Sequence, residues 1–173
     1  MDDIELIAAD TPLLHAELAA LAHVIWHQHY TPIIGEDQVR YMLDGGYNEA
    51  VLAEQQAAGT CFTLARRDDR FIAFAAVSPD PAEPSTAWLD KLYVLLEARN
   101  LGVGRRLVAR AADQAAAAGA DTLRLRVNRH NADSITAYQR LGFVVEYEDI
   151  KDIGQGYVMD DYVMAAPVAT LQR

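Results

Sequence analysis

Only one cysteine, Cys61, occurs among the 173 residues, so the chain cannot form an internal disulfide. A sequence so poor in thiols fits a reducing compartment, and we expect a cytoplasmic protein. Because Cys61 stands at the head of an apolar segment, we expect it to be a small core residue and not a nucleophile.

Long apolar runs are also missing. None approaches the about 18 to 20 residues that a membrane span requires. The start Met1-Asp2-Asp3 lacks the basic residues of a signal peptide. We therefore expect no association with a membrane.

Positive charge is scarce, with 15 Lys and Arg against 25 Asp and Glu and a formal net charge of -10. Nonspecific binding of nucleic acid needs a cationic surface, so no nucleic-acid partner is expected. The acidity suits a cationic substrate, but the needs of solubility explain it equally well.

Metal-binding motifs are absent from the sequence too. His23 and His27 lie four residues apart, but Val24 stands where a His-Glu-x-x-His site has glutamate, and no third ligand is apparent. We expect no metal. Repeats and linkers are lacking as well, so residues 1–173 are expected to form one domain.

A glycine turn between a strand and a helix is the most informative feature that is present. Gly102 and Gly104 follow the apolar segment 88–96 and precede a run with helical spacing. Arg105 and Arg106 stand in the first helical turn, where the helix dipole normally favours acidic residues. This pattern predicts an anion, most simply a phosphate, bound over the turn.

Two common phosphate-binding loops do not fit this turn. A Walker loop needs Lys and a hydroxyl residue after its last glycine, and Gly104 is followed by Arg105-Arg106-Leu107. A dinucleotide fingerprint needs a third small residue, and Leu107 occupies that position.

The remaining elements predict an α/β (α+β) fold with a mixed sheet. The unit formed by the central strand, the helix to Gly119 and the strand 123–127 requires two parallel strands, whereas the flanking hairpins are antiparallel. We expect the other strands at 4–8, 61–65, 71–77, 143–150 and 157–165. We expect the other helices at 12–29, 36–43, 48–58 and 132–141, with residues 30–35 breaking the first of them.

The turn Arg99-x-x-Gly102-x-Gly104 resembles the coenzyme A loop of the GNAT superfamily of N-acetyltransferases. A second block of that family follows in order and spacing: Val127-Asn128-Arg129-His130-Asn131, then Ile135, Tyr138, Leu141 and Gly142-Phe143. The resemblance implies a single GNAT-like domain, mostly antiparallel, whose two central parallel strands splay apart around the pantetheine arm of acetyl-CoA.

The resemblance also implies which residues bind acetyl-CoA. Backbone groups of residues 92–94 would pair with pantetheine, an oxyanion-facing N–H would lie at Val94 or Leu95, and the N–H groups of residues 100–105 would meet the pyrophosphate. The expected cofactor-binding residues are Leu92, Tyr93, Val94, Arg99, Asn100, Leu101, Gly102, Val103, Gly104, Arg105 and Asn131.

Two residues are candidates for catalysis. The resemblance gives Tyr138 the role of general acid near the sulfur, seven residues after Asn131; packing alone would also explain Tyr138, and helix capping would explain Asn131. A glutamate base of some relatives is absent, because its strand carries Arg124 and Arg126. Asp90 is the candidate base, and a water chain is the alternative.

The expected activity is acetyl-CoA-dependent N-acetylation of a small-molecule primary amine by direct attack in a ternary complex. Segments 26–30, 37–43 and 152–164 resemble bacterial spermidine/spermine N-acetyltransferases, so a polyamine is the favoured acceptor, and residues 26–47 would wall its pocket. Asp149, Asp152, Asp160 and Asp161 could attract it, or could be ordinary turn and edge-strand charges. A non-catalytic acetyl-CoA-binding module and an enzyme for peptide or protein amines remain alternatives, and a homodimer stays open.

Overall fold

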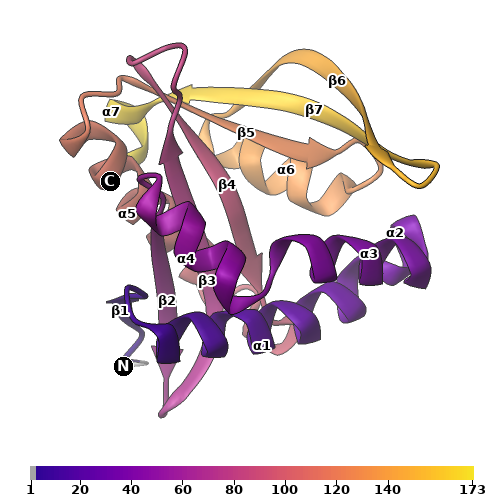
Figure 1. The fold of residues 1–173 in the computed structure, drawn as a ribbon. Coiled ribbons are helices and arrows are strands. Elements are labelled where there is room, and N and C mark those ends of the chain that lie inside the picture. The colour runs from indigo at the N-terminus through magenta and orange to yellow at the C-terminus, as the bar shows by residue number, and fades with distance from the viewer. Residues whose placement is uncertain (1–2) are drawn as a thin grey trace.

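A computed structural model of the chain describes residues 3–173. Seven strands form one sheet in the order β1-β2-β3-β4-β5-β7-β6 (Figure 1). The strands are β1 (Glu5–Ala8), β2 (Cys61–Arg67), β3 (Arg70–Pro79), β4 (Thr86–Val94), β5 (Thr122–Asn128), β6 (Val144–Gly154) and β7 (Tyr157–Pro167). The helices are α1 (Pro12–His29), α2 (Thr31–Ile34), α3 (Glu36–Gly46), α4 (Glu49–Ala57), η1 (Leu96–Ala98), α5 (Val103–Ala117), α6 (Ala132–Leu141) and α7 (Val168–Leu171).

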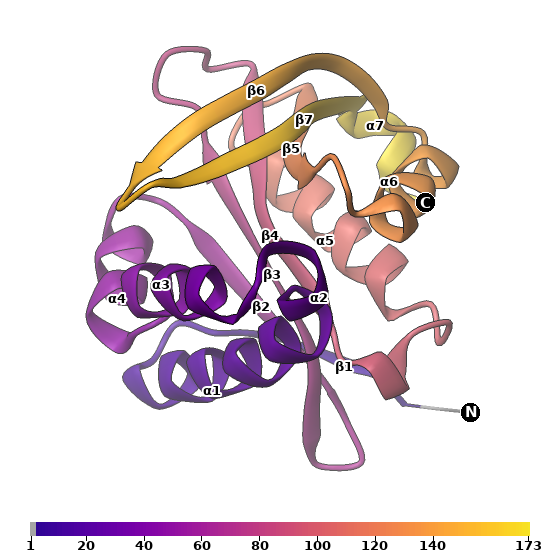
Figure 2. The ribbon, with the colours of Figure 1, turned by 90° about the vertical axis from the view of Figure 1, so that its right-hand side faces the viewer.

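Helices cover the sheet on both faces. In Figure 2, α1, α3 and α4 lie to one side, and α5, α6 and α7 lie to the other. The apolar stripe expected on α5, which includes Leu107, Val108, Ala111 and Ala115, is fully buried. The central strands β2 and β3 are buried along most of their length, as expected when both faces of a sheet are covered.

The parallel strands β4 and β5 pair only over their first halves. Their register runs from Thr86 opposite Thr122 to Leu89 opposite Leu125, and every other pair of neighbouring strands is antiparallel. Beyond Leu89 and Leu125 the two strands continue unpaired with each other. The predicted splayed central pair within a mixed, mostly antiparallel sheet is therefore confirmed.

A β-bulge at Asp90 marks the point where β4 leaves β5. Leu89 lies opposite Val77 and Lys91 opposite Ala76, so Asp90 has no partner on β3. Because partners across a sheet share a face, the bulge puts Trp88 and Lys91 on the same face although they are three positions apart.

The β6–β7 hairpin reaches across to α3 (Figure 2). The Tyr41 hydroxyl donates to the Ile153 carbonyl oxygen at 2.6 Å, and its ring lies 5.2 Å from that of Tyr157. The Gln38 amide donates to the Val158 carbonyl oxygen at 3.1 Å. These contacts join the β6–β7 hairpin to α3 on the side where β4 and β5 diverge.

The main departures from the sequence-based expectations are local. Residues 31–34 do not merely break α1 but form the short α2, with a proline in its first turn. The Cys61 prediction was wrong: Cys61 is exposed, because it is the first residue of β2 and lies at the end of the sheet, whereas residues 62–65 are buried. Among residues 3–173, no helix is both long and apolar enough to span a bilayer.

Candidate active site

The N-terminus of α5 is built to receive an anion. Gly102 is the N-cap residue with φ of 75°, a left-handed conformation that glycine adopts without strain. In the described part of the chain no side chain caps the helix, and no acidic residue stands in its first turn. The first N–H groups therefore lack intrahelical partners, and the exposed Arg105 and Arg106 add positive charge beside them.

Gly104 is not required by the fold itself. Its φ is not positive, and a Cβ atom placed on it would meet no other atom within 4 Å. The space over this backbone position is open, so a glycine here suits a ligand that approaches the main chain closely. The residues of the turn fit the predicted pyrophosphate of coenzyme A.

Hydrogen bonding along β4 decides which backbone groups face the gap between β4 and β5. The Leu95 N–H donates to the Ile72 carbonyl oxygen at 2.9 Å. Antiparallel partners alternate between bonded and non-bonded pairs, so the backbone groups of Val94 and Leu92 point away from β3 and into the gap. Those of Tyr93 face β3. Because the Leu95 N–H is already bonded, Val94 remains the candidate oxyanion donor.

A polar network joins the turn before α5 to the ends of α1 and α6. Arg99 Nη2 lies 3.1 Å from Nδ1 of His29, and His29 Nε2 lies 3.2 Å from Oδ1 of Asn131. Since arginine can only donate, His29 accepts at Nδ1 and carries its proton on Nε2. Burial and the neighbouring Arg99 lower the pKa of His29, which favours this neutral form.

Asn131 is buried at the N-cap of α6. Its Oδ1 accepts from the Ser134 N–H at 3.3 Å, and its Nδ2 donates to the Tyr30 hydroxyl at 3.4 Å. These bonds, with the one to His29, occupy its side chain. Direct contact between Asn131 and coenzyme A stays a prediction. In this structure Asn131 holds the side chains of His29 and Tyr30 in place.

Tyr138 is half-buried on α6 and packs edge-on against Phe143 at 5.7 Å. Burial and the neighbouring Tyr30 raise the pKa of Tyr138. Burial also raises the pKa of Tyr30, to about 12, and the pKa of Tyr93 well above its ordinary value. These phenols therefore stay protonated near neutral pH and act as hydrogen-bond donors.

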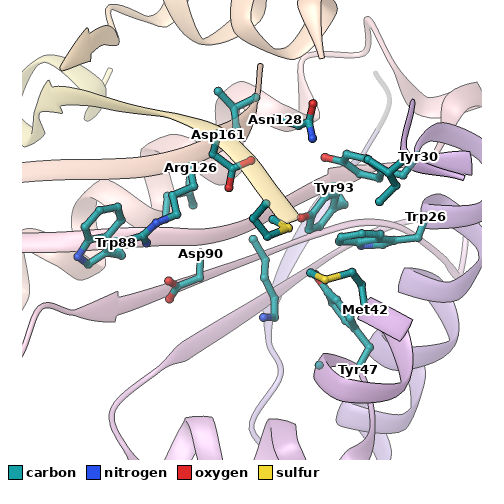
Figure 3. A pocket seen from close by; sticks show the side chains of 16 residues that line it. Trp26, Tyr30, Met42, Tyr47, Trp88, Asp90, Tyr93, Arg126, Asn128 and Asp161 are labelled. Carbon is teal, nitrogen blue, oxygen red and sulfur yellow. The ribbon is translucent and has the colours of Figure 1, made fainter. Parts of the chain in front are cut away.

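A cavity of about 230 Å³ opens beside the splayed ends of β4 and β5 (Figure 3). It is lined by Trp26, Tyr30, Ile34, Met42, Gly46, Tyr47, Trp88, Leu89, Asp90, Lys91, Tyr93, Arg126, Val127, Asn128, Met159 and Asp161. In Figure 3, Trp88, Asp90 and Arg126 lie at one end, whereas an aromatic group lies at the other. Six residues of the segment 26–47 line this cavity; that the segment walls an acceptor pocket stays a prediction.

The aromatic end is tightly packed. The Trp26 ring lies 4.5 Å from that of Tyr30, 5.7 Å from that of Tyr47 and 5.5 Å from that of Tyr93. Lys91 extends over the Tyr47 ring, with its ammonium 4.9 Å from the ring centre, and burial lowers the pKa of Lys91. This end suits the alkyl part of a ligand and gives it a rigid wall.

Asp90 lies at the polar end of the cavity, on the bulge of β4. The Ser78 hydroxyl donates to its carboxylate at 2.5 Å. Although Asp90 is exposed, partial desolvation beside the cavity raises the pKa of its carboxyl group, and the Ser78 hydrogen bond opposes that shift. A raised pKa makes a carboxylate a better proton acceptor near neutral pH.

The four aspartates near the C-terminus have different surroundings. Asp149 pairs with Arg126 at 2.9 Å, Asp160 pairs with Arg129 at 2.6 Å, and Asp152 accepts the Gly154 N–H in the hairpin turn. Asp161 differs from all three. It lines the cavity, is only 2% exposed, and its Oδ1 has no hydrogen-bond partner among residues 3–173.

The burial of Asp161 makes a prediction for stability. Burial, with the nearby charges of Asp149 and Asp160, raises the pKa of Asp161 to about 6, although Arg126 opposes the shift. The folded chain then holds this proton more tightly than the unfolded chain, so stability is present below pH 4 and is lost as pH rises to 6. The effect of Asp161→Asn on the free energy of unfolding should be more stabilising at pH 7.5 than at pH 4 by about 2 to 3 kcal/mol.

Urea denaturation of wild type and Asp161→Asn at pH 4 and pH 7.5 measures this difference. The extra stabilisation should disappear at the lower pH, where both side chains are neutral. An equal effect of the substitution at both pH values would mean that the carboxylate has a compensating partner inside the folded protein.

Sequence reasoning missed several residues of the site. His29 carried no motif, and its part in the network depends on Arg99, 70 positions away. In the sequence, Arg126 was noted only because its strand carries a glutamate base in some relatives. In the structure, its guanidinium group stacks over the Trp88 ring at 4.0 Å. The aspartate cluster drew attention to Asp161, but the pattern offered nothing to separate it from Asp160. Within residues 3–173, no cluster of His, Cys, Asp and Glu is arranged to hold a metal ion.

Comparison with known families and structures adds to this geometry. The model of the acetyltransferase (GNAT) family matches residues 19–143 of the chain. No curated protein sequence matches it significantly.

Solved structures with the same fold cover nearly the whole chain. PaiA N-acetyltransferase from Thermoplasma acidophilum, in complex with coenzyme A, aligns with a TM-score of 0.79 and 22% identity over 95% of this chain and 99% of its own. YncA from Salmonella typhimurium, with its cofactor acetyl-CoA, aligns with a TM-score of 0.65 and 17% identity over 96% and 94%. The ribosomal-protein-S18-alanine N-acetyltransferase from Escherichia coli aligns with a TM-score of 0.66 and 21% identity over 96% and 94%.

Proposed function

The chain belongs to the acetyltransferase (GNAT) family, and on that basis we propose that it transfers the acetyl group of acetyl-CoA to a primary amine of a small molecule. The observation that supports this proposal most is the position of the cavity. It opens where β4 and β5 part, which leaves the backbone groups of Leu92 and Val94 facing the gap. An acceptor in the cavity can thus meet a thioester held along β4.

The chain's own groups suit the binding of acetyl-CoA. The uncapped N–H groups after Gly102 would hold the pyrophosphate, Arg99, Asn100, Leu101 and Arg105 would border it, and the open space at Gly104 would let it approach. Leu92 and Val94 would bond the pantetheine amides as an added strand would. When bound, acetyl-CoA supplies the activated acyl group.

In the proposed reaction the amine nitrogen attacks the thioester carbon, the C–N bond forms and the C–S bond breaks. The Val94 N–H would stabilise the developing oxyanion. The protonated Tyr138 hydroxyl would donate to the departing thiolate, and Asp90, directly or through water, would accept the proton that the amine loses. The raised pKa of Asp90 supports the last role.

A thiol-release assay with acetyl-CoA tests this proposal. Polyamines, amino sugars, amino acids and peptides with free N-termini should be compared as acceptors at equal concentration. Turnover with a small amine supports the proposal, and turnover with peptides alone would favour a protein-directed enzyme. Binding of acetyl-CoA without turnover on any acceptor would identify a non-catalytic module.

For the acceptor we propose a small polycationic amine. The net charge of -10 and the two carboxylates of the cavity support this class. The volume of about 230 Å³ lies below the about 300–1,000 Å³ typical of pockets for drug-sized ligands, which favours a slender acceptor. Aliphatic amines are mostly protonated at neutral pH, so the enzyme must bind a cation and then remove one proton.

Spermidine should therefore have at least about a tenfold higher kcat/KM than a monoamine of similar length, because only the polyamine keeps a positive charge after the reacting nitrogen is deprotonated. Salt should lower kcat/KM by screening the attraction, and higher pH should raise it until the reacting amine is free. Steady-state kinetics at several salt concentrations and pH values measure all three effects. Equal use of spermidine and the monoamine, with no salt dependence, would rule out the polycationic acceptor.

A further inference from the structure

We infer that Asp161 is the residue that binds the non-reacting ammonium group of the acceptor, and that it thereby selects amines with a second positive charge. The inference rests on the proposed function and identifies a specificity-determining residue within it. Asp90 would serve the reacting nitrogen, and Asp161 the remote one.

The first support is the state of the Asp161 carboxylate. It is the only carboxylate among residues 3–173 that is buried, at 2% exposure, and its Oδ1 has no hydrogen-bond partner. A buried ionised group without a partner is costly and is rarely retained for structure alone. In Figure 3 this side chain points from β7 toward the middle of the cavity.

The second support is that the two cations of the cavity are engaged elsewhere. Arg126 pairs with Asp149 at 2.9 Å and stacks over the Trp88 ring. Lys91 lies over the Tyr47 ring. Arg126 still lowers the pKa of Asp161 in part, but neither cation forms an ion pair with it. A ligand ammonium group would supply the direct partner that Asp161 lacks among the described residues.

The third support is the sign of the charge around Asp161. Asp149 lies directly opposite it on β6, Asp160 precedes it, and both raise the pKa of Asp161. A second anion in the cavity would add to this repulsion, whereas an ammonium group would relieve it. The neighbourhood therefore discriminates against acceptors that carry a carboxylate or phosphate at this position.

The fourth support is the place of Asp161 within the cavity. It lies between the polar end, with Asp90 and Trp88, and the aromatic end, with Trp26 and Tyr93 (Figure 3). Asp161 pairs across the sheet with Asn128, the last residue of β5, and so lies at the edge of the gap between β5 and β4. An ammonium group bound there leaves an alkyl chain free to reach toward the thioester along β4.

A binding experiment can test this without catalysis. Trp26 and Trp88 are the two tryptophans of the sequence and both line the cavity, so tryptophan fluorescence reports on its contents. Wild type, saturated with coenzyme A, should show a saturable change on titration with spermidine. In Asp161→Asn the dissociation constant should rise by at least about 30-fold, the usual effect of removing one partner of a buried charge pair.

Asp160→Asn is the matched control. Asp160 is adjacent in sequence, but its side chain pairs with Arg129 and does not line the cavity. Its spermidine affinity should stay within threefold of wild type. Thermal denaturation verifies that each variant folds. If Asp161→Asn does not fold, Asp161→Ser provides a second test.

Kinetics separate this inference from the proposed function. In Asp161→Asn the preference for spermidine over a monoamine of similar length should fall close to one, while the KM for acetyl-CoA is unchanged. If wild type acetylates amines and Asp161→Asn keeps both its spermidine affinity and its preference, the inference is overturned and the function stands. If no amine is acetylated but Asp161→Asn still loses spermidine binding, the function fails and the ammonium site stands. If wild type binds no spermidine, the inference is overturned.

Discussion

Gly104→Val should weaken the binding of acetyl-CoA by at least about 100-fold while leaving a folded protein. The backbone N–H groups of this turn would hold the pyrophosphate, and a branched side chain at Gly104 would fill the space through which it approaches. Loss of two charge-assisted hydrogen bonds, at about 1.5 to 3 kcal/mol each, lowers affinity by at least about 100-fold. Isothermal titration calorimetry with acetyl-CoA measures the change.

The fold should tolerate this substitution. A Cβ at Gly104 meets no neighbour within 4 Å, and valine has a slightly higher helix propensity than glycine. Gly45→Val is the matched control, since Gly45 also lies in a helix with open space around its Cβ position but belongs to α3 and not to the turn. Unchanged acetyl-CoA affinity in a folded Gly104→Val protein would remove this turn from the binding site.

Tyr138→Phe should lower kcat by about 100-fold or more, with little change in the affinity for acetyl-CoA. The substitution keeps the ring and its packing against Phe143 and deletes only the hydroxyl. Because burial and Tyr30 raise the pKa of Tyr138, the phenol stays protonated across the working pH range and can donate to the thiolate as it leaves. Steady-state kinetics with saturating acetyl-CoA measure the effect.

Tyr147→Phe is a suitable control, because Tyr147 is exposed on β6 and is not among the residues that line the cavity. It should retain wild-type kcat. If Tyr138→Phe also retains wild-type kcat, Tyr138 is a packing residue, and Tyr30, whose phenol lies close enough to influence it, would be the next donor to substitute.

Local patterns were sufficient to predict most of the fold. Helix α1 begins at Pro12 and α6 spans Ala132–Leu141, both as expected. Asn131 caps α6, and Gly142 ends it in the left-handed conformation. These signals act within a few residues of one another, so the sequence displays them directly. The α5 turn was found for the same reason, since a helix start and its cap are adjacent in the chain.

The acceptor side of the site could not be predicted in this way, because it depends on contacts between distant segments. Strict alternation along β4 from Trp88 would place Leu92 on the cavity face, and the bulge places Lys91 and Tyr93 there instead. Asp161 differs from Asp160 only by the face of β7 that it occupies, and its environment includes Asp149 on another strand. Neither the bulge nor the strand pairing has a signature in the local sequence.

The bulge also gives β4 one position whose side chain can change without disturbing the pairing with β3. Asp90 is the residue of β4 that takes no place in the ladder with β3, since Leu89 and Lys91 already occupy consecutive partners. Removing or replacing it would leave Trp88, Lys91 and Tyr93 on their present face, and Leu92 and Val94 would still point their backbone groups into the gap. A lineage of such proteins can therefore gain, lose or exchange a carboxylate at this position without altering the half of the strand that faces the acyl donor.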